Sequence, residues 1–123
     1  MDERLHAVRG ATSVERNSPD AIVAATEELM RELIARNELE PEQFVSCIFT
    51  ATPDLDAEFP ALAARRIGLD RVPLLCAQEI AVPGGLGRVI RVLAHYHASR
   101  EHEARHVYLG EARSLRADLD AAQ

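Results

Sequence analysis

Residues 44–52 read FVSCIFTAT, a run of aromatic and β-branched side chains that has the length of one strand. Pro53 and Asp54 follow directly and end the run. A short, mostly apolar segment bounded in this way predicts a buried strand. The elements on either side of this strand decide the fold class.

Upstream of the strand, the sequence predicts an amphipathic helix. Ser18 serves as N-cap, Pro19 as the first helical residue and Asp20 as an acid near the positive helix end, while Asn37 marks a stop. Apolar and small side chains between them share one face: Ile22, Val23, Thr26, Leu29, Met30, Leu33 and Ile34. Before this helix, residues 4–10 end in a glycine and predict a first strand.

Downstream, residues 59–68 predict a short alanine-rich helix that ends at Gly68, and residues 72–76 predict a further strand. Glycines 84, 85 and 87 mark a loop. Residues 88–96, RVIRVLAHY, fit a helix by spacing and a strand by their β-branched content; we favour the strand. Residues 106–109 predict a last short strand, and a polar tail with Arg113 and Arg116 follows.

This alternation of strands and helices predicts one mixed α/β (α+β) domain over residues 1–123, with two main helices. We expect residues 1–3 and about 117–123 to be flexible ends. Two helices cannot cover both faces of a sheet of four or five strands. We therefore hypothesise that copies of the chain associate through the uncovered face.

The composition excludes several classes of function. All 14 basic residues are arginine and 20 residues are acidic, so the net charge of −6 disfavours nucleic-acid and anionic-membrane partners. Without lysine, Schiff-base chemistry and the usual P-loop are excluded. The charged first residues predict no signal peptide, and no apolar run has the length of a membrane span. Cys47 and Cys76 lack metal or disulfide spacing and are expected to be reduced thiols in the cytoplasm.

Four polar residues stand at or near predicted strand ends. Arg9 precedes Gly10, and Glu79 follows the strand that contains Cys76. Arg91 interrupts an apolar strand, where a guanidinium requires a carboxylate, an anionic ligand or an exposed face. Tyr108 lies near Arg105 in the last strand, and a phenol beside a guanidinium suits carboxylate recognition. Each residue also fits an ordinary surface or edge-strand position, so these alternatives stay open from spacing alone.

No metal or cofactor motif is expected. Asp54, Asp56 and Glu58 lack the full spacing of a calcium loop and can instead cap a helix. The histidines at 95, 97, 102 and 106 lack zinc-site spacing, and the glycine-rich loop lacks the dinucleotide spacing. The remaining arginines, glutamate, tyrosine and thiol suit binding of a small polyanion better than acid–base hydrolysis.

In their order and spacing, several short blocks resemble the small trimeric chorismate mutases of the α/β type. The resemblance runs from Arg9 to Leu119, and its blocks are RGATSVE (9–15), ATPDL (51–55), FPA (59–61), VP (72–73), Cys76, QE (78–79), GGL (84–86), IRV (90–92), RHVYL (105–109), LR (115–116) and DL (118–119). It implies a homotrimeric pseudo-α/β barrel with active sites at subunit interfaces. It further implies that chorismate rearranges to prephenate without cofactor, metal, covalent intermediate or proton transfer.

The resemblance also implies roles for individual residues. Arg91 would contact the ether oxygen and a carboxylate, Arg9 and Tyr108 would bind carboxylate oxygens, and Glu79 and Cys76 would hold the ring hydroxyl. The neighbouring subunit would supply an apolar wall made of Phe59, Ala61, Leu74 and Leu75. Arg65 and Arg116 would stand at the entrance, and Leu115 would also bind the substrate.

Two departures from the family pattern predict weaker substrate capture. Leu62 stands where some relatives carry lysine, and Leu75 where some carry threonine. Two other classes stay open: a non-catalytic binder or sensor of small carboxylates, and an imine-hydrolysing enzyme of similar trimeric architecture. The spacing of Cys76, Glu79 and Arg91 favours the mutase over both. A purely structural interaction protein is the least favoured class.

Overall fold

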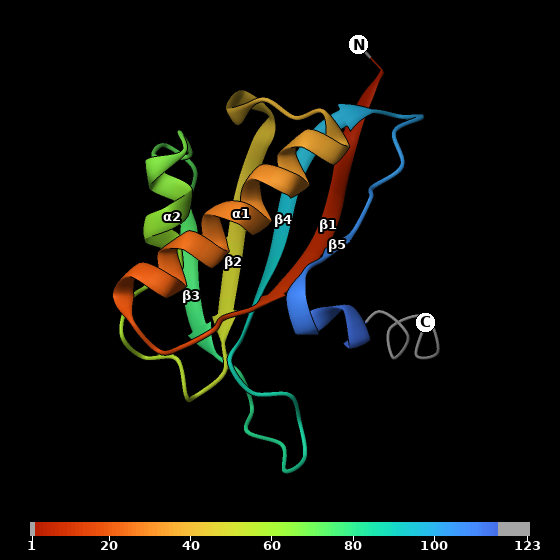
Figure 1. The fold of residues 1–123 in the computed structure, drawn as a ribbon. Coiled ribbons are helices and arrows are strands. Elements are labelled where there is room, and N and C mark those ends of the chain that lie inside the picture. Colours follow the sequence, from red (N-terminus) through yellow and green to blue (C-terminus); the bar gives the residue numbers. More distant parts are fainter. Residues whose placement is uncertain (1, 116–123) are drawn as a thin grey trace.

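A computed structural model describes residues 2–115, in which one mixed sheet carries two α-helices on one side (Figure 1). The sheet has five strands in the order β3-β2-β4-β1-β5. The elements in chain order are β1 (Glu3–Ser13), α1 (Pro19–Asn37), η1 (Pro41–Gln43), β2 (Phe44–Ala51), α2 (Ala61–Arg66), β3 (Leu74–Gln78), β4 (Val89–Ser99), β5 (Val107–Tyr108) and η2 (Gly110–Ser114). The predicted α+β class, with a single mixed sheet and two main helices, is confirmed.

The strand predicted from FVSCIFTAT is β2, which lies inside the sheet between β3 and β4. It runs parallel to β3 and antiparallel to β4, and β4 in turn pairs antiparallel with β1. Phe49 and Cys47 point to the helix side and are buried, as the prediction of a buried strand requires. The short β5 is the other edge strand and pairs in parallel with β1.

Helix α1 has the predicted bounds because both of its ends are set by local chemistry. The Ser18 hydroxyl accepts a hydrogen bond from the Ala21 backbone N–H at 3.2 Å, and Pro19 opens the helix. At the other end Glu38 adopts a left-handed conformation with φ of 52°, which terminates the helix after Asn37. Its buried face, with Leu29, Met30 and Leu33 at its centre, packs on the sheet.

The first strand is longer than predicted. Gly10 does not end it, because Ala11, Thr12 and Ser13 continue the antiparallel pairing with β4. A Cβ on Gly10 would lie only 3.1 Å from the Leu29 Cδ1, so the glycine serves close packing of β1 against α1 instead of a turn. The prediction that Arg9 emerges at a strand end is therefore wrong, since Arg9 lies in the interior of β1.

Three other boundaries differ from the predictions. Helix α2 is shorter than residues 59–68, because Pro60 occupies its N-cap and Gly68 takes φ of 109° beyond its end. Strand β3 begins two residues later than predicted, since the Val72 N–H donates to the Leu69 carbonyl in a turn that ends at Val72. The 88–96 segment is a strand, as favoured, and pairing with β1 extends it to Ser99.

At the C-terminal end of the described chain, the last strand is confined to Val107 and Tyr108. Arg105 precedes this strand and is exposed, so its expected place in the strand beside Tyr108 is wrong. After β5 the chain forms the 3₁₀ helix η2, where the sequence predicted only a polar tail. Its first turn is held by Ser13, whose hydroxyl accepts a hydrogen bond from the Glu111 N–H at 2.9 Å.

The side of the sheet opposite the helices, called here the open face, has no covering element among residues 2–115 (Figure 1). Large apolar side chains stand exposed on this side, with Leu75 at 61% and Leu5 at 49% exposure. Such a surface is typical of a site of association or binding. No described helix is long and apolar enough to cross a membrane.

Candidate active site

The strand register brings the predicted arginines together on the open face. Thr50 of β2 lies opposite Arg91 of β4, Arg91 opposite Ala11 of β1, and Ala11 opposite Tyr108 of β5. Arg9 lies two residues before Ala11 on β1, opposite Leu93. A hollow of about 250 Å³ is lined by both arginines and by Tyr108. Three side chains that are distant in sequence therefore border one space because their strands are neighbours.

Arg91 is held beside a carboxylate but keeps a donor free. Its Nε lies 3.0 Å from the Glu79 Oε2, a close ion pair. The N–H does not aim at that oxygen, so this buried Nε has no hydrogen-bond partner within residues 2–115. An unpaired buried donor costs free energy, and an anionic ligand placed on the open face can satisfy it. Arg91 therefore meets the requirement deduced from its sequence: it has a carboxylate partner and room for a ligand.

Glu79 is fixed at the end of β3, where it was predicted. Its backbone N–H donates to the Ala51 carbonyl at 2.9 Å, which extends the pairing with β2 by one residue. Its side chain accepts a hydrogen bond from the Thr50 hydroxyl at 2.7 Å and is only 16% exposed. Beyond Glu79 the chain leaves the sheet in a loop that projects past its end (Figure 1).

This loop, residues 80–88, is tied back to the sheet by Asp54. Both carboxylate oxygens of Asp54 accept from the Arg88 N–H, at 2.9 and 3.1 Å, and Thr52 donates to the same carboxylate. The Arg88 side chain in turn donates to the Val14 carbonyl at 3.0 Å. The loop and Arg91 line a second hollow of about 450 Å³ that includes Glu79. Arg91 thus lines two hollows, one shared with Arg9 and one formed with the loop.

Arg9 is positioned by a histidine at the edge of the sheet. Its backbone N–H donates to the Nδ1 of His106 at 3.0 Å, so this nitrogen must be unprotonated. Burial, followed by the nearby Arg9 charge, lowers the pKa of His106. The net lowering favours the neutral ring that this hydrogen bond requires.

A second group of predicted site residues lies elsewhere in the chain. Phe59 and Cys76 line a hollow of about 360 Å³ together with Leu55 and Pro60, and Phe59 is 68% exposed. The two hollows that contain the arginines include neither Phe59 nor Cys76. Within one chain, the arginines and the apolar residues of the predicted site therefore line separate hollows.

The other predicted residues are dispersed. Ala61 is buried in α2 and Arg65 is exposed on the same helix. Leu74 packs toward the helix-side core, whereas Leu75 points to the open face. Leu115 follows η2 and is half-buried, and Arg116 lies outside the described residues, as does the expected flexible end at 117–123.

The acidic and histidine sets considered as metal ligands are engaged in other contacts. Asp54 binds the Arg88 N–H, and Asp56 accepts from the Asn17 amide at 2.8 Å. His102 bonds to Tyr96 at 2.7 Å, and His95 lies 3.3 Å from the Ser46 hydroxyl. Within residues 2–115, no group of three or more such side chains is placed to hold a metal ion.

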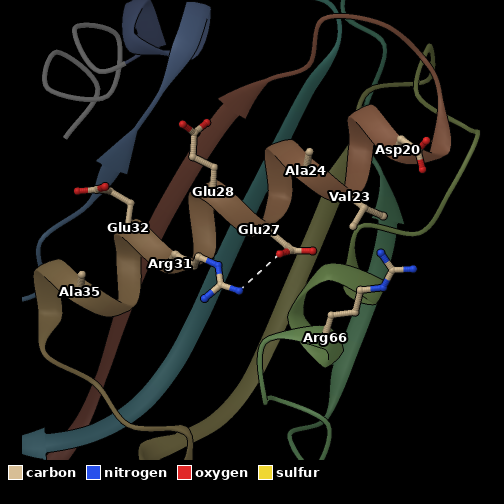
Figure 2. A pocket seen from close by; sticks show the side chains of 9 residues that line it. All are labelled: Asp20, Val23, Ala24, Glu27, Glu28, Arg31, Glu32, Ala35 and Arg66. Carbon is tan, nitrogen blue, oxygen red and sulfur yellow. Dashed lines mark ion pairs between the residues drawn. The ribbon is translucent and has the colours of Figure 1, made fainter.

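The outer face of α1 carries a larger hollow of about 730 Å³, shown in Figure 2. Acidic side chains dominate it: Asp20, Glu27, Glu28 and Glu32. Arg31 is paired with Glu27 at 3.6 Å, as the dashed line in Figure 2 marks. A small polyanion would be repelled here, so size alone does not identify the anion site.

Comparison with known proteins shows the family of the chain. Residues 5–119 match the family model described as chorismate mutase type I. The chain belongs to the type I chorismate mutase family.

Full-length relatives and a solved structure support this assignment. The chain is 49% identical over 121 residues to chorismate mutase AroH of Thermus thermophilus, covering 97% of this chain and 99% of the relative. It is 41% identical over 117 residues to chorismate mutase AroH of Bacillus subtilis (strain 168), covering 94% and 92%. The chorismate mutase structure from Clostridium thermocellum matches with a TM-score of 0.86 and 46% identity, covering 89% of this chain and 99% of that one.

The sequence did not point to every residue that shapes the candidate site. Thr50, Arg88 and His106 hold Glu79, the loop and Arg9, yet none was singled out for that role. Strand alternation could have placed Thr50 on the face of Arg91 if the pairing register had been known. Asp54 was considered only as a metal ligand or helix cap, because the sequence does not show that its carboxylate accepts hydrogen bonds from the Arg88 N–H.

Proposed function

We propose that this type I chorismate mutase converts chorismate to prephenate by holding the substrate compact and stabilising charge on its ether oxygen. The observation that carries the proposal is the free Nε donor of Arg91, which lies buried between the Arg9 hollow and the Glu79 carboxylate. Chorismate is a dicarboxylate with a ring hydroxyl, and these groups match cations and a hydrogen-bond acceptor respectively.

The reaction requires no proton transfer, because one carbon–oxygen bond breaks while one carbon–carbon bond forms within the same molecule. The enzyme must restrict a flexible dicarboxylate to its reactive shape and then stabilise the negative charge that develops on the ether oxygen. A fixed guanidinium in a site shielded from water can do both. No general acid, general base or cofactor is needed for this mechanism.

In the proposed arrangement, Arg91 donates to the ether oxygen and to one carboxylate. Arg9 and Tyr108, which line the same hollow, bind carboxylate oxygens. Glu79 accepts a hydrogen bond from the ring hydroxyl, assisted by Cys76. The position of Glu79 beside Arg91 also supports this division of roles, because the hydroxyl acceptor and the main cation must contact the same small ring.

We further propose that each site is completed by a second chain in a homotrimer. The open face with its exposed Leu75 supports association, and the separation of Phe59 and Cys76 from the arginines supports a site shared between chains. The neighbour would contribute the apolar wall of Phe59, Ala61, Leu74 and Leu75, with Arg65 and Arg116 at the entrance and Leu115 near the tail. Sedimentation showing only monomer at micromolar concentration would refute this assembly.

The free thiols Cys47 and Cys76 are consistent with a reducing compartment, so we also propose a cytoplasmic location.

The activity is tested by mixing purified protein with chorismate and following the loss of its ultraviolet absorbance. Prephenate is then identified by its conversion to phenylpyruvate in acid. We expect turnover without any added metal or cofactor. A folded oligomer that binds chorismate without converting it would overturn the proposed reaction and leave a carboxylate-binding protein.

A further inference from the structure

Thr50 is the one side chain of the described residues that donates a hydrogen bond to the Glu79 carboxylate. Its hydroxyl lies 2.7 Å from the Glu79 Oε2. Alternation along β2 places Thr50 on the open face between the buried Phe49 and Ala51. The strand register puts it directly opposite Arg91. Thr50 is therefore adjacent to both partners of the central ion pair.

The contacts of Glu79 are unevenly divided between its two oxygens. Oε2 accepts from Thr50 and lies 3.0 Å from the Arg91 Nε, whereas Oε1 accepts no hydrogen bond from residues 2–115. A carboxylate beside an arginine ordinarily turns to form two parallel hydrogen bonds with the guanidinium. Here the Arg91 Nε–H remains unpaired despite the short distance. The Thr50 hydrogen bond to Oε2 opposes such a turn, because turning the carboxylate would move Oε2 away from the hydroxyl.

We propose that Thr50 is a positioning residue for the mutase reaction: it holds the Glu79 carboxylate so that Oε1 faces the substrate hydroxyl and the Arg91 donor stays available. The inference rests on the proposed function of the same site. If Glu79 were free to pair fully with Arg91, two effects would follow. The acceptor for the ring hydroxyl would be misdirected, and the positive potential at the ether oxygen would be weakened.

Two substitutions of Thr50 distinguish the effect of losing the hydroxyl donor from the effect of changing the shape of the side chain. Thr50→Val keeps the branched form, which suits a strand, and removes the donor. Thr50→Ser keeps the donor and removes a methyl group. Because hydrogen bonds to charged groups are among the stronger ones, we expect Thr50→Val to lower kcat by about tenfold or more. Thr50→Ser should restore kcat to within about threefold of the wild type, with the KM of both variants changing less than kcat.

A double-mutant cycle with Glu79→Ala shows whether Thr50 acts through Glu79. In the Glu79→Ala background, Thr50→Val should cause no further loss of kcat. An equal loss in both backgrounds would overturn the proposal, as would a Thr50→Val enzyme with unchanged kcat or a Thr50→Ser enzyme as slow as Thr50→Val. Wild-type enzyme that fails to convert chorismate would contradict the proposed function instead.

A readout without substrate tests the positioning itself. Crystal structures of ligand-free wild type and Thr50→Val should differ at Glu79, whose carboxylate should turn to place both oxygens on the Arg91 guanidinium in the variant. Finding Glu79 in the same orientation in both structures would contradict the inference even if activity changed.

Discussion

In the proposed site, the Glu79 carboxylate serves binding without acting as a base. Its Oε2 accepts a hydrogen bond from Thr50 and lies beside the Arg91 Nε, which leaves Oε1 as the acceptor for the substrate. Since glutamine keeps a carbonyl oxygen at this place, Glu79→Gln should retain more activity than Glu79→Ala. We expect the alanine variant to lose roughly ten- to a hundredfold in kcat/KM. Steady-state kinetics on chorismate measure both, and equal losses would indicate that the charge itself is needed.

Arg91 and Arg9 show which features of single site residues can be predicted from the sequence and which cannot. Arg91 was recognised because a guanidinium within an apolar strand requires a partner, which is a physical argument available from sequence. Arg9 looked like a strand-end residue, because Gly10 resembled a terminator. That glycine instead allows close packing on Leu29, a contact made across the fold and invisible in the sequence. The positioning roles of Thr50 and His106 depend on register in the same way.

At the scale of elements, α1 was predicted with its bounds because Ser18 and Pro19 set its start locally and the chain turns left-handed at Glu38, directly after Asn37. The strands were predicted with errors of a few residues, because the pairing partner decides where a strand stops. β1 and β4 extend each other to Ser13 and Ser99, although neither end has a sequence signal for this. The order β3-β2-β4-β1-β5, which brings Arg9 and Arg91 together, likewise follows from tertiary pairing.

The N-cap of α1 gives a prediction at this scale. Ser18→Ala removes the acceptor for the Ala21 N–H, so we expect the free energy of unfolding to fall by about 1 kcal/mol. Helix α1 covers one side of the sheet (Figure 1), whereas Arg91 lines the hollow on the open face, so kcat should not change. Denaturant unfolding and the chorismate assay measure the two quantities. Ser18→Asn, which keeps a capping oxygen, serves as the control and should unfold like the wild type; a loss of activity in Ser18→Ala would contradict the separation of helix and site.

At the scale of the whole molecule, two histidines link stability to pH. The pKa of His102 is lowered by burial and then by the charges of His6 and Arg105, against a smaller opposing effect of Glu38, and the pKa of His106 is lowered by burial and by Arg9. Both rings therefore bind protons less readily in the folded chain than in the unfolded one. The free energy of unfolding should be fully maintained above about pH 6.5 and should fall as the pH decreases below it.

Urea unfolding between pH 8 and pH 5 measures this dependence. Replacing His102 and His106 by asparagine should flatten the decline between about pH 6.5 and 5, where histidines titrate. A wild-type stability that rises on acidification through this range would show that the histidine environments have been misjudged. Carboxylates contribute mainly at lower pH, which keeps the two effects apart.

The whole account depends on one cation on the open face of the sheet, Arg91, acting on the charge that develops in chorismate. The most direct measurement is kcat/KM for Arg91→Ala beside wild type, with Arg31→Ala on the outer face of α1 as a matched loss of one arginine. We predict a loss of several kcal/mol in transition-state stabilisation, about a thousandfold or more in rate, for Arg91→Ala with the fold and oligomer intact, and wild-type kinetics for Arg31→Ala. An Arg91→Ala enzyme that keeps most of its turnover would contradict the account.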